Sequence, residues 1–82
     1  MPSVNYEKDS NVQSVLFNKH LFSVMQAMNW LRLHGFHGTY ENIHYPDETK
    51  NYYRFRQYNP IKGERYITRN SKTSGIKFVI SY

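Results

Sequence analysis

The chain has 82 residues, of which 11 are Lys or Arg and 6 are Asp or Glu, so its formal net charge is +5. A chain of this length forms one small domain whose core only just outweighs conformational entropy, and a deep enzyme cleft is not expected. It contains no cysteine, so neither disulfides nor thiolate metal sites stabilise it. Aromatic residues make up 17% of it, with eight tyrosines, which argues against a disordered chain.

No segment indicates a membrane protein or a secreted one. The apolar runs are all shorter than the roughly 20 residues that a membrane-spanning helix needs, and residues 1–8 lack the basic and then apolar order of a signal peptide. We therefore expect a soluble protein without membrane contacts. The absence of cysteine fits the interior of a cell or a virion.

The chain begins with a polar stretch, residues 1–11, that has no periodicity and is expected to be a flexible arm. Residues 12–82 are then a single domain. Its first element is Val12–Phe17, a β-branched and aromatic run typical of a strand.

A helix is expected directly after this strand. Ser23 and Gln26 have the spacing of a capping box, and Gly35 is the expected left-handed stop. The residues between them carry an apolar stripe at helical spacing that predicts packing on a sheet: Val24, Ala27, Met28 and Leu31. Trp30 flanks the stripe and is expected in the core, with a partner-binding helix as the alternative.

Four further strands are predicted in the second half of the chain: Thr39–Tyr45, Tyr52–Tyr58, Arg65–Arg69 and Ile76–Tyr82. Turn-forming residues separate them at Pro46–Thr49, Asn59–Gly63 and Asn70–Gly75. Ile76–Tyr82 is the most apolar run and is expected inside the sheet. The order β-α-β-β-β-β predicts an α+β fold, with one helix packed on a mostly antiparallel sheet of four to five strands.

Positive charge is concentrated in the second half of the chain. Residues 50–82 carry eight Lys or Arg against one acid, whereas residues 1–49 carry three against five. If Tyr52–Tyr58 is a strand, its alternation places basic and aromatic side chains together on one face. These side chains are Tyr52, Arg54, Arg56 and Tyr58.

This basic, aromatic face is the candidate binding site. Guanidinium groups bind phosphates and rings stack on unpaired bases, so the face predicts a nucleic-acid platform. Arg65, Arg69 and Lys77, together with Lys62 and Lys72, extend the charge over the later strands and turns. The alternatives are a protein-docking surface and an ordinary solvated face on which arginine stems cover the rings.

No motif predicts metal binding, a cofactor or catalysis. His34 and His37 form an H-x-x-H pair with His44 downstream, but His34 suits the end of a helix and no cysteine completes a site. Serine and histidine do not occur at a spacing that brings them together for nucleophilic catalysis. We therefore expect a protein that is not an enzyme and that has no metal or cofactor.

Four pieces of sequence occur in order: Val12–Phe17, Trp30–Gly35, Tyr52–Gln57 and Gly75–Ile80. Together they resemble a small uncharacterised domain of tailed bacteriophages and large DNA viruses, with its W-L-x-x-H-G helix, Y-R-F-R-Q strand and G-I-x-x-V-I strand. The resemblance spans residues 12–82. It implies a viral protein located in the virion or the host-cell interior, and it carries over no functional residues. The last strand departs from the pattern by ending in Ser81-Tyr82 instead of a glycine-rich exit.

The expected function is thus that of a small viral binding protein that holds nucleic acid by backbone contacts and stacking. The alternative is a virion structural or adaptor protein that docks on capsid or core proteins through the same face. The sequence does not distinguish DNA from RNA, and it does not indicate an oligomeric state.

Overall fold

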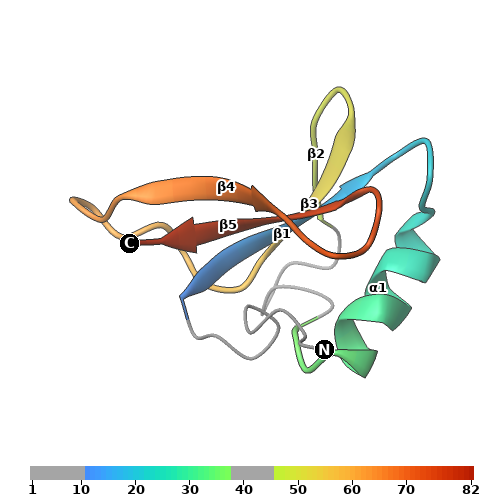
Figure 1. The fold of residues 1–82 in the computed structure, drawn as a ribbon, viewed down its shortest axis with the longest axis horizontal. Helices are drawn as coiled ribbons and strands as arrows, with labels where there is room; N and C mark the ends of the chain where they lie inside the picture. Colours follow the sequence, from blue (N-terminus) through green and yellow to red (C-terminus); the bar gives the residue numbers. More distant parts are fainter. Residues whose placement is uncertain (1–10, 38–45) are drawn as a thin grey trace.

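A computed structural model describes residues 11–37 and 46–82, and in these ranges one helix lies against one face of an antiparallel sheet of five strands (Figure 1). The elements are β1 Val12–Asn18, α1 Val24–Leu33, β2 Asp47–Glu48, β3 Tyr52–Arg56, β4 Tyr66–Asn70 and β5 Ile76–Ser81. The predicted α+β class and the order β-α-β-β-β-β are confirmed.

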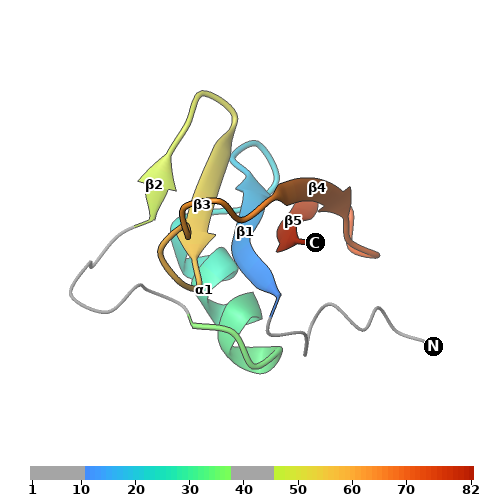
Figure 2. The same ribbon diagram turned by 90° about the vertical axis from the view of Figure 1, so that its left-hand side faces the viewer.

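The strands lie in the order β2-β3-β1-β5-β4, so β1 is central and β2 and β4 are the edges. The prediction that the last strand lies inside the sheet is confirmed, since β5 pairs with β1 on one side and with β4 on the other. In Figure 2, α1 lies below β1 and β3, and β4 lies on the side away from the helix. The edge strand β4 is therefore not covered by the helix.

Local sequence signals position α1. The backbone N–H of Gln26 donates to Ser23 Oγ at 3.1 Å and the N–H of Ser23 donates to Gln26 Oε1 at 2.9 Å, which confirms the capping box. The helix ends where Gly35 takes a φ of +83°, as the glycine predicts. The N–H of Phe36 then donates to the carbonyl oxygen of Leu31 at 2.8 Å and turns the chain back towards the sheet.

The core lies between α1 and one face of the sheet. Ala27 and Leu31 of the predicted stripe have no exposed surface, and Trp30 packs its ring against Phe17 at 5.7 Å and Phe78 at 6.3 Å between ring centroids. The sheet contributes alternate residues of its three inner strands: Val15, Phe17, Phe55, Ile76, Phe78 and Ile80. Trp30 is partly buried and packs against this core, as predicted, and the face of the sheet opposite α1 is left to interact with other groups.

The prediction for the segment before β3 is partly wrong. Pro46–Thr49 was expected to be a turn, but Asp47 and Glu48 pair with β3 as the short strand β2. Two polar residues carry no periodicity, which is why the pattern did not indicate a strand. Residues 1–10, expected as an arm, and 38–45, which include the whole of the predicted strand Thr39–Tyr45, lie outside the described residues.

The later strands are confirmed with shifted ends. β3 stops at Arg56, two residues before the predicted Tyr58, although the N–H of Gln57 still bonds to the carbonyl oxygen of Gln13 in β1. β5 stops at Ser81, so Tyr82 is 72% exposed and does not continue the buried row of Ile80. The ring of Tyr58 therefore lies outside β3, and the strand carries one aromatic residue fewer than expected.

Candidate nucleic-acid interface

The face of the sheet opposite α1 is called the open face here. Val15 and Phe55 point into the core, so their neighbours Arg54 and Arg56 point to the open face. Arg54 lies opposite Leu16 of β1, which in turn lies opposite Lys77 of β5. The predicted alternation of β3 is confirmed, and it brings Tyr52, Arg54 and Arg56 to the same face as Lys77.

Arg54 and Arg56 share one carboxylate from the neighbouring edge strand. Oδ2 of Asp47 lies 3.1 Å from Arg54 Nη2 and 2.8 Å from Arg56 Nε. Asp47 reaches both because it pairs directly with Arg54 in the β2–β3 hairpin. The side chains of the two arginines are 36% and 33% exposed. The open face therefore carries ion-paired arginines instead of the free cations that the sequence suggested.

The connection from β3 to β4 passes β1 and β5, which lie between these two strands. It lies on the open face, because its Glu64 bonds to Tyr66, which pairs with Ser81 and so points away from the core. Glu64 anchors it, since its Oε1 accepts hydrogen bonds from the hydroxyls of Tyr58 and Tyr66. Partial burial and the bond to Glu64 raise the pKa of the Tyr66 hydroxyl, which therefore stays protonated as a donor. Ser14, on the open face of β1, has no exposed surface, so Ser14 itself is not accessible to a ligand.

The rings of the predicted platform are engaged within the protein. Tyr58 lies beyond the end of β3 and bonds to Glu64 at 3.1 Å. Tyr52 has the Nζ of Lys77 5.4 Å from the centre of its ring. Both tyrosines are half-buried. They do not form the exposed pair of stacking rings that the alternation predicted.

The remaining predicted residues gather around β4. Arg65 is exposed and immediately precedes the strand, and Arg69 is exposed on the strand itself. Because Arg69 pairs with Phe78, it points to the helix side of the sheet and not to the open face. Lys62 in the preceding turn and Lys72 in the β4–β5 turn are also exposed. The predicted site residues thus divide between the open face and the β4 edge.

The cations around β4 and β5 are called the basic hairpin surface: Lys62, Arg65, Arg69, Lys72 and Lys77. The single acid in the same stretch is Glu64, whose carboxylate already accepts two tyrosine hydroxyls. Within residues 11–37 and 46–82, no carboxylate forms an ion pair with Lys62, Arg65 or Arg69. These three exposed cations are available to an external anion.

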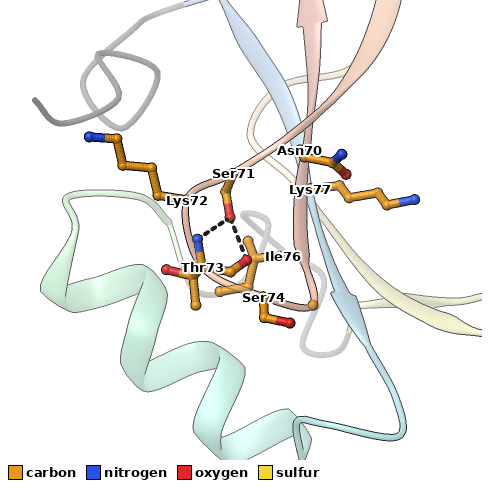
Figure 3. Close-up of a pocket in the computed structure, with 8 residues that line it drawn as sticks. Asn70, Ser71, Lys72, Thr73, Ser74, Ile76 and Lys77 are labelled. Atoms are coloured by element: carbon orange, nitrogen blue, oxygen red, sulfur yellow. Dashed lines mark hydrogen bonds between the residues drawn. The ribbon is translucent and has the colours of Figure 1, made fainter.

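The β4–β5 turn forms a shallow polar hollow lined by residues 70–77 (Figure 3). Ser71 holds it together, because its Oγ donates to the carbonyl oxygen of Thr73 at 2.9 Å and accepts from the N–H of Thr73 at 3.0 Å. Lys72 and Lys77 extend to opposite sides of the turn in Figure 3. Their amines do not converge on one small ligand, so the turn offers charge to an extended polyanion.

His34 of the H-x-x-H pair has a structural position. His34 stacks on Trp30 with ring centroids 3.9 Å apart, and its Nδ1 lies 2.8 Å from the carbonyl oxygen of Trp30. In the described part of the chain no three His, Asp or Glu side chains are grouped as metal ligands would be, and His44 lies outside it. No described helix has the length and apolar character required to cross a bilayer.

The chain matches no family model, no curated protein and no solved structure. The resemblance to a viral domain therefore stays a prediction based on four pieces of sequence.

The contacts of two acids with the candidate site residues were not predicted from the sequence. Asp47 was placed in a turn, and its pairing with Arg54 and Arg56 was not expected. A hairpin signal was present, because a tight polar turn at Thr49 aligns Asp47 with Arg54. Glu64 is the single acid of residues 50–82, and no sequence signal links it to Tyr58 and Tyr66, which it meets because the β3–β4 connection crosses the sheet.

Proposed function

We propose that this chain is a small, non-enzymatic viral protein that binds nucleic acid through the basic hairpin surface. The observation that carries the proposal is that Lys62, Arg65 and Arg69 are exposed without a described carboxylate partner, next to an acid that is already engaged. Such cations neutralise phosphates and release the counterions that are condensed on the nucleic acid, which favours binding to any nucleic-acid backbone.

The length of β4 supports contacts with several phosphates. Arg65 and Lys72 lie on either side of the strand, and at about 3.4 Å per residue they are at most about 24 Å apart along the chain. Arg69 lies between them on an edge strand that the helix does not cover. An extended backbone is thus able to follow the edge of the sheet and to meet cations along its whole length.

One exposed ring accompanies these cations. Tyr82 is the most accessible of the described tyrosines, and its N–H donates to the carbonyl oxygen of Arg65 at 3.1 Å. A ring in this position stacks on an unpaired base while Arg65 binds the neighbouring phosphate. This supports a preference for single strands, with backbone contacts and stacking in place of base readout.

A virion structural or adaptor role is the second candidate, and the free edge of β4 favours it. The backbones of Arg65 and Ser71 form hydrogen bonds with β5. Because the backbone groups of successive residues in an edge strand point alternately towards and away from its neighbour, those of Tyr66, Thr68 and Asn70 point away from the sheet. Exposed backbone groups of this kind pair with an added strand of a partner. A capsid or core protein with an acidic extended segment would fit this edge.

The test is binding to fluorescently labelled single-stranded and duplex oligonucleotides as salt is raised, read by anisotropy. Three phosphate contacts, at Lys62, Arg65 and Arg69, predict a log–log slope of about −2 for single strands, at about −0.7 per contact. Binding with this slope and a preference for single strands supports the proposal. Binding that is equally strong for single-stranded and duplex oligonucleotides and that vanishes by physiological salt would instead favour the virion role.

A further inference from the structure

We infer that Arg54 and Arg56 form a second phosphate-binding site, which the carboxylate of Asp47 fills in the free protein. This rests on the proposed function, since it adds a contact for the same ligand on the open face. The ligand class is a phosphate group of a nucleic-acid backbone. Asp47 then acts as an internal competitor that the phosphate must displace.

The first observation is the convergence of two cations on one oxygen. Arg54 Nη2 and Arg56 Nε lie 3.1 Å and 2.8 Å from the same Oδ2 of Asp47, so two positive charges share a single negative one. Guanidinium groups bind the oxygens of phosphate as readily as those of a carboxylate, because their planar N–H groups match both. A phosphate brings more acceptor oxygens and more negative charge to the same position.

The second observation is that Asp47 is an imperfect ligand for Arg56. Arg56 Nε is buried and makes no hydrogen bond with acceptable geometry, although the carboxylate oxygen is only 2.8 Å away. A buried donor without an aligned acceptor is unfavourable, and natural structures seldom leave one without a reason. A tetrahedral phosphate, with oxygens in several directions, is able to align one of them with this N–H.

The third observation is the weak attachment of the competitor. β2 has two residues and pairs only with β3, at the edge of the sheet. Short edge elements open at a small fraction of the free energy of global unfolding. Asp47 is therefore displaceable while the core between the sheet and α1 stays intact.

The two arginines are also continuous with the basic hairpin surface. Arg54, Leu16 and Lys77 form one cross-strand row on the open face. Two strand spacings of about 4.8 Å separate Arg54 from Lys77, so a polyanion held at Lys77 reaches the arginines without leaving the sheet.

The experiment compares Asp47→Asn with Glu48→Gln. Both variants remove one negative charge from β2, but Asp47 bonds to the arginines, whereas Glu48 forms its ion pair with Lys19 at 2.6 Å. Asp47→Asn is expected to steepen the salt slope for a labelled oligonucleotide by about one unit, as one to two added phosphate contacts require. Glu48→Gln should stay within a few tenths of the wild-type slope. Equal slopes in the two variants would overturn the inference.

A second readout does not depend on nucleic acid. The Nε–H signals of Arg54 and Arg56 are followed by NMR as inorganic phosphate is added to each folded variant. Shifts at these signals in Asp47→Asn, and smaller ones in Glu48→Gln, support the site, and their absence in Asp47→Asn overturns it. If the wild type binds no oligonucleotide at low salt, the proposed function fails, and the phosphate titration still decides whether the arginine pair is an anion site.

The arginines themselves provide the last control. In the Asp47→Asn background, replacing Arg54 and Arg56 by Gln should return the oligonucleotide slope to the wild-type value or below it. A gain in slope that survives this replacement would show that the effect of Asp47 is one of net charge, which overturns the inference.

Discussion

Lys77 holds its ammonium group 5.4 Å from the centre of the Tyr52 ring and so joins β5 to β3 across the central strand. From the sequence, both residues were predicted to bind a ligand, the Tyr52 ring by stacking on a base and the Lys77 amine by contact with phosphate. In the protein they contact each other, and such a cation–π pair contributes about 0.5 to 1 kcal/mol at an exposed site. Among the described tyrosines, the ring most accessible to a base is that of Tyr82.

Tyr82→Leu tests this reassignment of the stacking ring. The substitution keeps an apolar side chain but removes the flat π surface, so affinity for a single strand should fall by about 1 to 3 kcal/mol while duplex affinity hardly changes. Anisotropy with the two oligonucleotides measures both. Tyr52→Leu is the control and should have the smaller effect. A larger loss in Tyr52→Leu than in Tyr82→Leu would return the stacking site to the open face.

Trp30→Ala tests whether α1 is held by its aromatic core contact. Trp30 packs on Phe17 and Phe78, so its removal should lower the free energy of unfolding by about 3 kcal/mol or more. Met25→Ala on the same helix is the control, because Met25 is 75% exposed and its truncation should cost less than about 0.5 kcal/mol. Urea denaturation measures both. If Trp30→Ala leaves stability unchanged and abolishes ligand binding, the helix is an interface.

Gly75→Ala tests the close approach between the β4–β5 turn and the start of the helix. Gly75 and Gly63 have φ values of +85° and +86°, so an alanine at either position meets the left-handed cost of about 1 to 2 kcal/mol. An added Cβ at Gly75 would also lie 2.7 Å from Leu21 Cδ1, whereas nothing lies within 4 Å at Gly63.

The clash with Leu21 should make Gly75→Ala less stable than Gly63→Ala. Because the Leu21 side chain is able to move aside, we expect this difference to be only about 1 kcal/mol. Thermal unfolding of the two variants gives this difference directly. Equal melting temperatures would mean that the turn and Leu21 are not in contact in solution.

The sequence predicted the elements that bury an apolar face. β5 and α1 follow from the periodicity around Phe78 and Leu31, because burial of one face imposes a period of two or 3.6 residues. β1 follows from its β-branched and aromatic composition. The capping box at Ser23 and the glycine at 35 marked the helix ends, since each satisfies backbone groups locally. These signals lie within a few residues of the structure they produce.

The partners of the candidate site residues were not predictable in the same way. Alternation placed Arg54 and Arg56 on one face, but their partner Asp47 belongs to a strand of only two residues. The covering of Tyr58 depends on the strand order, which sends the β3–β4 connection across the open face. Such pairings are set by the topology, and no local pattern reports them.

The salt dependence of oligonucleotide binding in two double variants tests the proposed interface most directly. Arg65→Ala/Arg69→Ala and Arg54→Ala/Arg56→Ala both remove two positive charges, but only the first pair lacks a described carboxylate partner. The first double variant should flatten the log–log slope by about one to two units and the second by clearly less. Equal slopes in wild type and Arg65→Ala/Arg69→Ala would remove the basic hairpin surface from the binding site.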